Sequence, residues 1–219
     1  LELYSDQNGF NNAAALLADT NSFKGIDIIR FGNSINEIME RKSLENISIL
    51  LQMEQCIQMF HQYYRYEKIE GMDRKSVDKI PERDFREAVA NALVHRMWDI
   101  PASIKISMYS DKIEISSPGG LPAGISEDEY LNGQISLLRN PIIGNVFFRL
   151  KYIEKFGTGI MRINYAYKDA LIKPDYHIFS NSIQIILPVI KSDYKLNETE
   201  KKLLNILKIN GSMTRNEIE

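Results

Sequence analysis

The stretch REAVANALVHR, residues 86–96, decides how the rest of the chain is interpreted. It follows Pro81, and its apolar residues recur at intervals of three and four, which is typical of a helix with one face in the core. The apolar residues in this pattern are Phe85, Ala88, Val89, Ala92 and Leu93. Glu87, Asn91 and His95 fall four residues apart, so they form one polar stripe along a mostly apolar helix.

The polar stripe has a chemical and a structural interpretation. An ionised glutamate on a buried helix is costly unless it faces a ligand, a cation or water. The amide oxygen of Asn91 suits Mg²⁺, and Glu87 could orient or deprotonate a water that attacks a γ-phosphate. In the structural interpretation, Glu87 pairs with Arg83 or Arg86. Asn91 then makes a local hydrogen bond, and His95 is a histidine at a helix end. The helix alone favours neither interpretation.

Outward from this helix, the sequence predicts alternating helices and strands. Helices are expected at Asn11–Asp19, Ser43–Tyr64, Pro141–Phe156 and Ile160–Ala170, with a short one near Ser126–Leu131 in a loop over 123–140. Strands are expected at Gly25–Gly32, in a hairpin around Ser110–Lys112, and in a second hairpin formed by Tyr176–Phe179 and Ser182–Val189. Residues 65–81 are charged and irregular, which is typical of a strand followed by a loop.

Composition limits the classes of function. The 219 residues carry a formal net charge of −2, so overall charge gives no case for a nucleic-acid or membrane surface. The single cysteine, Cys56, excludes an internal disulfide and a cysteine-rich zinc site, and it is typical of a reducing compartment. Because no apolar run approaches the length that spans a bilayer, we expect no membrane contact and a cytoplasmic location.

The C-terminal segment changes character. Asn197 and Glu200 have the spacing of a helix capping box, and Thr214 with Glu217 predicts the start of a second helix after Gly211. This order is typical of the beginning of a winged helix-turn-helix. We therefore expect residues 193–219 to be the start of such a domain, truncated before its recognition helix.

Three motifs carry a resemblance to a known family. EAVANA, residues 87–92, resembles the N-box of the gyrase/Hsp90/histidine-kinase/MutL (GHKL) ATPases. SSPGGLP, residues 116–122, stands where that family has its first glycine box, and the GTG of Gly157–Gly159 resembles its second, whose backbone amides meet phosphate. The resemblance implies ATP and Mg²⁺ as cofactors, with Glu87 as the general base and Asn91 as a Mg²⁺ ligand.

The order of the motifs is similar to one branch of that family. REAVANALVHR, IEISSPGGLP, LLRNPII and IEKFGTGIMRI together resemble the RecG-related C-terminal ATPase-like domain, and the match spans roughly residues 80–190. In prokaryotic transcriptional regulators this domain commonly follows an AlbA-like (Schlafen-type) DNA-binding domain and precedes a winged helix. The resemblance implies a Bergerat-type α/β sandwich, with helices on one face of a mixed, mostly antiparallel sheet. It also implies three regions: a connector over 1–75, the ATPase-like domain over 76–192, and the partial winged helix.

The resemblance implies a set of nucleotide-binding residues in addition to Glu87. They are Asn91, His95, Ser117, Gly119, Gly120, Arg139, Gly157, Thr158 and Gly159. The first glycine box of the superfamily normally carries an aspartate that binds the adenine amino group, whereas this chain has Ser117, or Ser116, at that place. Each motif also has a simpler interpretation: a plain turn for Gly119–Gly120 and a solvated loop for Arg139.

Two hypotheses of function follow from these features. In the first, the domain binds Mg-ATP, hydrolyses it slowly and switches a regulator that contacts DNA through flanking domains. In the second, it is a non-catalytic ligand-sensing or dimerisation module of a DNA-binding transcription factor. Glu87 and Asn91 favour the first, and the missing adenine aspartate favours the second. A helicase motor is not expected because the sequence has no G-x-x-x-x-G-K-[ST] loop. Dimerisation is common in the superfamily, so a homodimer is a candidate assembly without a specific sequence signal.

Overall fold

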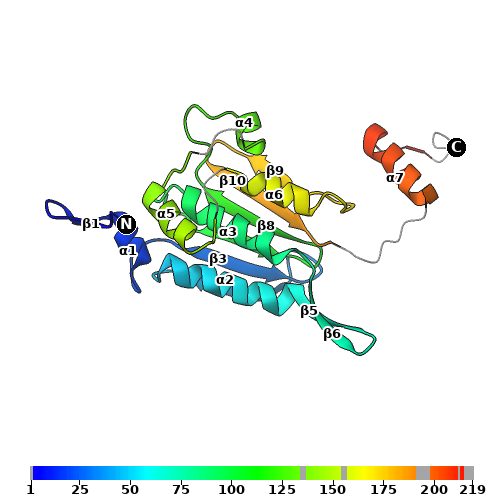
Figure 1. Ribbon diagram of the computed structural model, residues 1–219, viewed down its shortest axis with the longest axis horizontal. Coiled ribbons are helices and arrows are strands. Elements are labelled where there is room, and N and C mark those ends of the chain that lie inside the picture. Colours follow the sequence, from blue (N-terminus) through cyan, green and yellow to red (C-terminus); the bar gives the residue numbers. More distant parts are fainter. Residues whose placement is uncertain (1, 134–136, 154–156, 191–197, 212, 215–219) are drawn as a thin grey trace.

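The centre of the molecule is a six-stranded sheet with helices packed on one face. The structure, a computed structural model, describes residues 2–133, 137–153, 157–190, 198–211, 213 and 214. The strand order in the sheet is β4-β3-β7-β8-β10-β9, and only β3 and β7 run parallel. Figure 1 shows α2, α3 and α6 in front of this sheet. The predicted mixed, mostly antiparallel α/β architecture is therefore confirmed.

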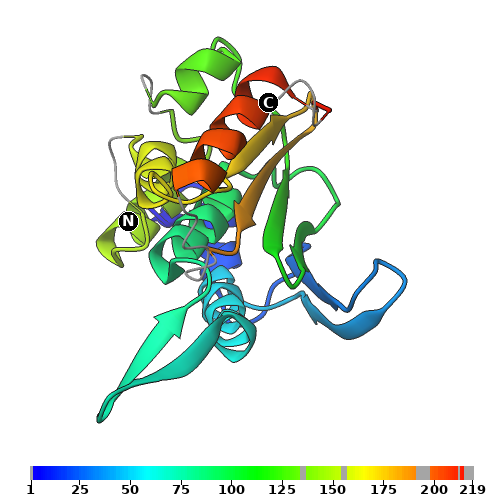
Figure 2. The ribbon, with the colours of Figure 1, turned by 90° about the vertical axis from the view of Figure 1, so that its right-hand side faces the viewer.

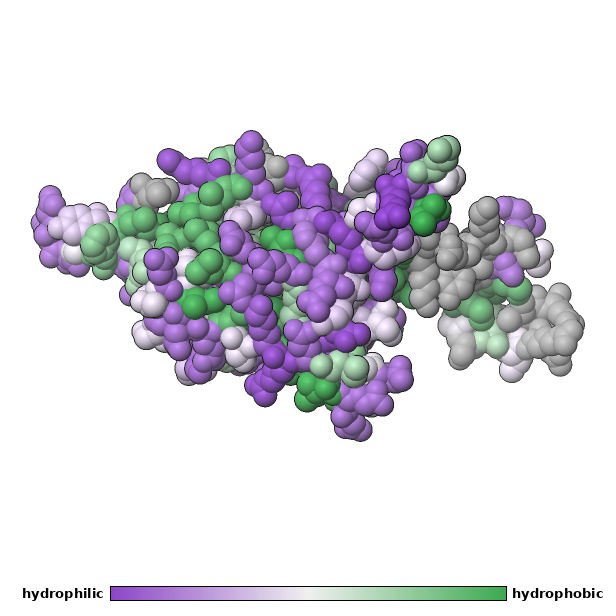
Figure 3. Space-filling view, turned by 90° about the horizontal axis from the view of Figure 1, so that it is seen from below, coloured by the Kyte–Doolittle hydropathy of each residue, from purple (hydrophilic) through white to green (hydrophobic). Residues whose placement is uncertain are grey.

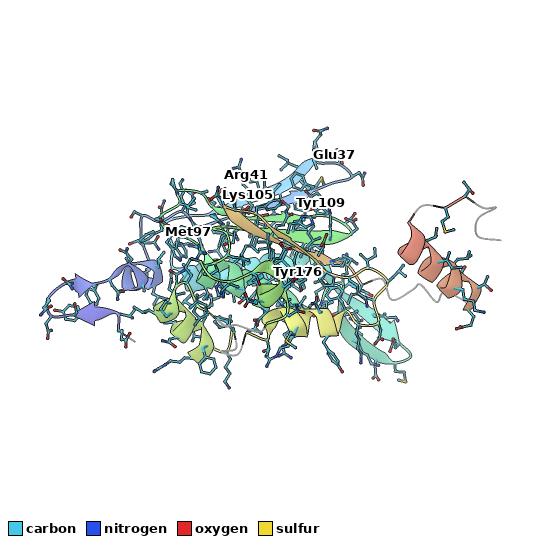
Figure 4. The ribbon with its side chains drawn as sticks, turned by 90° about the horizontal axis from the view of Figure 1, so that it is seen from above. Glu37, Arg41, Met97, Lys105, Tyr109 and Tyr176 are labelled. Atoms are coloured by element: carbon cyan, nitrogen blue, oxygen red, sulfur yellow. The ribbon has the colours of Figure 1, made fainter. Side chains whose placement is uncertain are left out.

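The strands of the sheet come from three separate parts of the sequence, each of which supplies two neighbouring strands. Their bounds are β3 Ile26–Phe31, β4 Ile38–Leu44, β7 Ile104–Met108, β8 Lys112–Pro118, β9 Asp175–Ile178 and β10 Ser182–Pro188. Every second residue of β7 and β8 is buried, because successive side chains of a strand point to opposite faces and only one face carries helices. On the other face, Arg41 and Lys105 lie on the side opposite α5 and α6, as Figure 4 shows.

Most of the helices before the C-terminal one begin at residues suited to helix starts. The bounds of the helices in this part of the structure are α1 Asn12–Leu17, α2 Ile49–Tyr64, α3 Glu82–His95, α4 Glu127–Leu131, α5 Pro141–Arg149 and α6 Gly159–Ala166. Ser48 caps α2, Ser126 and Glu129 form a capping box on α4, and Pro141 occupies the first turn of α5. None of the helices in the described ranges has the length and apolar character that crossing a bilayer requires.

The core lies between α2, α3 and the sheet. Phe60 of α2 stacks on Phe85 of α3 with ring centroids 4.6 Å apart, and both rings are fully buried. Ala88, Val89 and Leu93 of α3 are also fully buried. Helix α3 is therefore fixed on most of its circumference, so the direction of its polar stripe is fixed as well.

Two of the predicted helices are wrong in extent. Ser43 and Leu44 end strand β4, where Leu44 pairs with Ile26, and α2 begins only at Ile49. Leu44 matched the helical spacing because it is buried, but it is buried in the sheet. The helix predicted over Pro141–Phe156 ends at Arg149.

The segment predicted as a strand and a loop is instead a complete hairpin. Strands β5 (Arg65–Glu70) and β6 (Asp73–Asp78) pair with each other around Gly71, which has a φ of +65°. Figure 2 shows the hairpin projecting from the body of the molecule. Met72 at its tip is fully exposed. A second short hairpin, β1 (Tyr4–Ser5) with β2 (Gly9–Phe10), lies at the N-terminal end.

The C-terminal helix is present, whereas the predicted motif around it is only partly described. Helix α7 spans Glu198–Asn210, and Gly211 follows it with a φ of +75°. Asn197, which the predicted capping box requires, and residues 215–219, which the predicted second helix requires, lie outside the described residues. The winged helix-turn-helix therefore remains a prediction.

Candidate functional site

Helix α3 presents Glu87, Asn91 and His95 from one side, and the first two bond to each other. The Nδ2 atom of Asn91 donates a hydrogen bond of 3.2 Å to Oε1 of Glu87. This is the local contact expected in the structural interpretation, and it also leaves the amide oxygen of Asn91 as the atom suited to a cation. Both side chains are half-buried.

The first residue of α6, Gly159, packs directly against that pair. A Cβ atom at Gly159 would overlap Oε1 of Glu87 and would lie 3.1 Å from Nδ2 of Asn91. The close approach of α6 to α3 therefore favours glycine here, since a larger residue would displace the end of the Glu87 side chain. The contact joins two motifs that lie about seventy residues apart in the sequence.

The polar stripe and the second glycine motif line one small cavity of about 60 Å³. Its polar and backbone lining comes from Glu87, Asn91, His95, Gly157 and Gly159. A neighbouring cavity of about 20 Å³ is lined by Ser117, Gly119 and again by Asn91 and His95. The structure thus brings seven of the ten predicted site residues around two adjoining spaces.

Tyr130 of α4 lines both of these spaces. Burial raises the pKa of its hydroxyl to about 12. Ligand pockets usually enclose about 300–1,000 Å³, so the two spaces are too small for a nucleotide in this conformation. Tyr130 and Ile125, from the stretch Leu121–Gly133, line the larger of the two spaces, so their side chains would have to move to admit one. The sequence reasoning missed Tyr130 because a lone tyrosine in a predicted loop carries no motif.

The sequence offers two serines, Ser116 and Ser117, for the place that contacts adenine. The structure puts these two side chains in different surroundings. Ser117 is 8% exposed and lines the smaller cavity, and its hydroxyl donates a 2.8 Å hydrogen bond to the carbonyl of Ala92. Ser116 instead accepts a 3.1 Å hydrogen bond from Gln184 and does not line either space. Of the two serines only Ser117 lines a cavity, and its hydrogen is already donated within the protein, so its correspondence to the family's aspartate stays a prediction.

Burial keeps His95 neutral. The burial of the ring, with a smaller contribution from the positive charge of Arg139, lowers its pKa to about 4. At neutral pH the ring therefore offers one nitrogen as a donor and one as an acceptor, and contributes no positive charge for a phosphate.

Three predicted site residues lie outside the two spaces. Gly120 packs on the turn between β9 and β10, because a Cβ there would overlap the carbonyl of Ser180. Arg139 donates a 2.6 Å hydrogen bond to the carbonyl of Gly120, and it lines a separate cavity of about 550 Å³ beyond the end of α3. Thr158 lines a further cavity of about 460 Å³. Their predicted roles as nucleotide ligands stay predictions.

Two side chains near the end of α3 hold the surrounding loops in place. Arg96 is 1% exposed, and its guanidinium donates to the carbonyls of Lys24, Gly25, Ile100 and Ala102. Asn140 donates two 2.8 Å hydrogen bonds to the carbonyls of Val94 and Arg96. The Asn140 amide thus caps the last turn of α3.

The residues suit Mg²⁺ only as part of a nucleotide complex. Mg²⁺ usually keeps several water and phosphate ligands and takes few protein ligands, so one amide oxygen from Asn91 is consistent with it. Within the described ranges, no three His, Cys, Asp or Glu side chains are grouped so that they could hold a metal ion.

Comparison with known proteins supports the fold and part of the resemblance. Residues 102–187 match the family model described as the putative ATP-dependent DNA helicase recG C-terminal. The match includes both glycine motifs but starts after the helix that carries Glu87, Asn91 and His95. No curated protein matches the chain.

A solved structure extends the similarity to most of the chain. The DIP2311 protein from Corynebacterium diphtheriae aligns with a TM-score of 0.72 and 22% sequence identity over 86% of this chain. At that identity the likeness establishes the fold alone. The chain spans 39% of the length of the DIP2311 chain.

Proposed function

We propose that the chain binds Mg-ATP in the space between α3 and the Gly157–Gly159 turn, and that Glu87 directs a water molecule in slow hydrolysis. The observation that carries this proposal is the close approach of Gly159 to Glu87 and Asn91. It joins a carboxylate, an amide and a helix start around one cavity, which are the groups that a magnesium-bound phosphate requires.

Each residue has a distinct role in the proposal. The backbone amides at the start of α6 hold phosphate, since the first amides of a helix have no partner within it. Asn91 supplies its amide oxygen to Mg²⁺ while its nitrogen stays bonded to Glu87. Glu87 orients the attacking water and takes its proton. The family model matched by residues 102–187 supports nucleotide as the ligand class.

Binding requires the side chains that fill this space to move. Tyr130 and Ile125, from the stretch Leu121–Gly133 after β8, line the cavity of about 60 Å³. Arg139 bonds to the carbonyl of Gly120, which holds the chain directly before this stretch. We expect the nucleotide to bind slowly, because association waits for this movement.

Isothermal titration with ATP and Mg²⁺ tests binding. The expected result is a saturable heat that Asn91→Ala weakens at least tenfold, while Asn36→Ala, a change in the exposed β3–β4 loop, leaves it unaltered. If neither heat nor a thermal shift appears with any nucleotide, the proposal fails.

Phosphate release tests the role of Glu87 separately. Glu87→Gln keeps the shape of the side chain, so it should retain nucleotide binding and lose release by at least tenfold. Glu54→Gln, on the exposed face of α2, is the matched control and should release phosphate at the wild-type rate. Equal release by both variants would remove the general-base role while leaving binding intact.

A non-catalytic module is the second candidate, and specific observations favour it. The Ser117 hydroxyl is donated to Ala92, and the amide of Asn91 is donated to Glu87. Both donors are therefore hydrogen-bonded within the protein and need no ligand. This is expected of a domain that keeps the fold for sensing or dimerisation. Nucleotide binding without phosphate release in the wild-type protein would select this candidate.

DNA binding and transcriptional regulation are proposed for the whole protein and not for this domain. We propose that residues 1–75 connect to a DNA-binding domain and that residues 193–219 begin a winged helix, so that nucleotide binding alters DNA affinity in a cytoplasmic regulator. A gel shift with the full-length protein, with and without Mg-ATP, tests this. A shift that is absent, or unaffected by nucleotide, contradicts it.

A further inference from the structure

A cavity of about 460 Å³ lies between the start of α3 and α6 and shares no lining residue with the two spaces around Glu87. Its polar lining comes from Arg83, Asp84, Thr158 and Arg162. Pro81, Met161, Tyr165 and Ala166 complete it. The cavity thus has charged groups of both signs and an apolar wall, and the proposed nucleotide site uses none of its charged side chains.

Two of the lining side chains carry buried polar atoms without a partner. Asp84 is 2% exposed, and its Oδ2 atom has no hydrogen bond within the described residues. The same holds for Oγ1 of Thr158. Buried polar atoms are nearly always hydrogen-bonded, so a pair of exceptions at one cavity calls for a missing partner. A carboxylate and a hydroxyl can both accept, so they suit a donor group such as an ammonium.

The rest of the lining suits an anionic group and an apolar one. Arg83 forms no ion pair in the part of the chain that the structure describes, and a guanidinium can bind a carboxylate through two parallel hydrogen bonds. Arg162 lines the same cavity from α6. Met161 and Tyr165 are 50% and 69% exposed, so they offer apolar surface at the opening.

We propose that this cavity binds a small ampholyte of the amino-acid class. Its ammonium group bonds to Asp84 and Thr158, its carboxylate pairs with Arg83 and Arg162, and its side chain lies against Met161 and Tyr165. The volume is at the lower end of the range for small-molecule sites and fits one such molecule. A ligand with a carboxylate alone would leave the buried Oδ2 of Asp84 without a partner, and one with an ammonium alone would make no ion pair with Arg83, so the cavity discriminates against ligands with a single charge.

An exposed apolar surface elsewhere on the molecule says less about what it would bind. Figure 3 shows hydrophobic residues gathered towards the N-terminal end. Phe10 is 77% exposed there, and nothing else in that region indicates what would cover it. The cavity at Asp84 is the more specific feature because its own groups define the chemistry of the occupant.

The test is a thermal-shift screen followed by calorimetry on the intact protein. The probes are the twenty proteinogenic amino acids, with n-propylamine and propionate as ligands that carry one charge only. We expect at least one amino acid to bind with a Kd below about 1 mM, and neither single-charge probe to bind at the same concentration. Binding of propylamine or propionate as tight as that of the best amino acid would overturn the proposal, and so would no binding at all.

Variants locate the site. Asp84→Asn keeps the size of the side chain and should weaken amino-acid binding at least tenfold, whereas Asp19→Asn, at an exposed site after α1, should leave it unchanged. Arg83→Ala, at an exposed position, tests the carboxylate end without disturbing the core and should also weaken binding at least tenfold. Wild-type affinity in both Asp84→Asn and Arg83→Ala would overturn the assignment. Nucleotide titrations are not involved, so this outcome is independent of the proposed ATP function.

Discussion

Two cavities flank the contact between α3 and α6, and they differ in how their polar groups are satisfied. Around Glu87, the carboxylate accepts from Asn91, Ser117 donates to a backbone carbonyl, and the space that remains is about 60 Å³. Around Asp84, one turn earlier on the same helix, the carboxyl oxygen Oδ2 has no partner within the described residues, and the space is about 460 Å³. In the smaller, first cavity the donors of Asn91 and Ser117 are bonded within the protein, whereas in the larger, second cavity a buried carboxyl oxygen lacks a partner among the described residues.

The difference shows that a recognisable motif and an available ligand site need not coincide. Glu87 stands out in the sequence because Asn91 follows it at the spacing of a known motif. Asp84 does not, because an acidic residue in the first turn of a helix is favoured by the helix dipole and needs no other explanation. Only its burial and its missing partner distinguish it.

The largest expected effect is on stability, through the charge of Asp84. Burial raises the pKa of this carboxyl from 3.8 to about 7, with the positive Arg83 acting against the shift and the negative Glu87 adding to it. The folded state therefore takes up a proton between about pH 4 and pH 7, so stability falls as pH rises through that window. Asp84→Asn should raise the free energy of unfolding at pH 8 by on the order of 2–4 kcal/mol.

Urea unfolding from pH 4 to pH 8 measures this effect. The gain from Asp84→Asn should grow across the window, while Asp19→Asn should show none. Tyr167 and Tyr176 are also coupled to the charge of Asp84, but burial raises both of their pKa values well above this range, so they stay neutral throughout. If Asp84→Asn raised the free energy of unfolding by the same amount at every pH, the effect would come from packing, and not from the charge that distinguishes the second cavity.

The first cavity should show the opposite pH dependence through His95. Its pKa is lowered from 6.5 to about 4. Between these two pH values the folded state therefore binds fewer protons than the unfolded state. Stability is then lost as pH falls from about 6.5 to 4. His95→Gln should remove up to about 3 kcal/mol of this acid-induced loss. The same unfolding series measures it, with His177→Gln on β9 as the control, and identical acid profiles for the two variants would contradict the burial of a neutral ring.

The elements around both cavities were predictable wherever a local pattern sets the structure. The alternation of Ile104, Ile106 and Met108 predicted β7, because one face of a sheet strand is buried. The spacing of Phe85, Ala88 and Val89 predicted α3 in the same way. Leu44 shows the limit: its burial fits a helix and a strand equally well, and only its pairing with Ile26 decides between them.

The candidate site could be predicted in part, because sequence order does not give side-chain direction. Gly157 and Gly159 line the cavity at Glu87, whereas Thr158 between them lines the cavity at Asp84. Arg139 was expected near phosphate; it bonds to the carbonyl of Gly120 and lines the cavity of about 550 Å³, so its role as a phosphate ligand stays a prediction. Neighbouring residues in a turn point in different directions, and the sequence contains no pattern that assigns each to its cavity.

A methyl group at Gly159 would test the packing of α6 against α3. Gly159→Ala should destabilise the protein by about 1–3 kcal/mol, because the new Cβ overlaps Oε1 of Glu87. Nucleotide binding, if present, should fall at least tenfold. The double variant Glu87→Ala with Gly159→Ala should recover most of the stability.

The control is Gly124→Ala, at a position with a φ of +86° and no atom within 4 Å of the added Cβ. This variant is destabilised by backbone strain alone, so Glu87→Ala should not rescue it. Equal rescue of both would show that Gly159 is not required by the close approach of the two helices.

The smallest expected effect concerns the ring that keeps the first cavity closed. Tyr130 lines both spaces around Asn91 and His95, so Tyr130→Ala should enlarge them and favour the open state of the stretch from Leu121 to Gly133. A ligand that binds only the open state gains affinity in proportion to that shift, and we expect ATP to bind about three- to tenfold more tightly by calorimetry. Tyr165→Ala removes a tyrosine from the wall of the second cavity and should leave ATP affinity unchanged. If Tyr130→Ala instead weakens ATP, the ring contacts the nucleotide, and the first cavity is closed by something other than Tyr130.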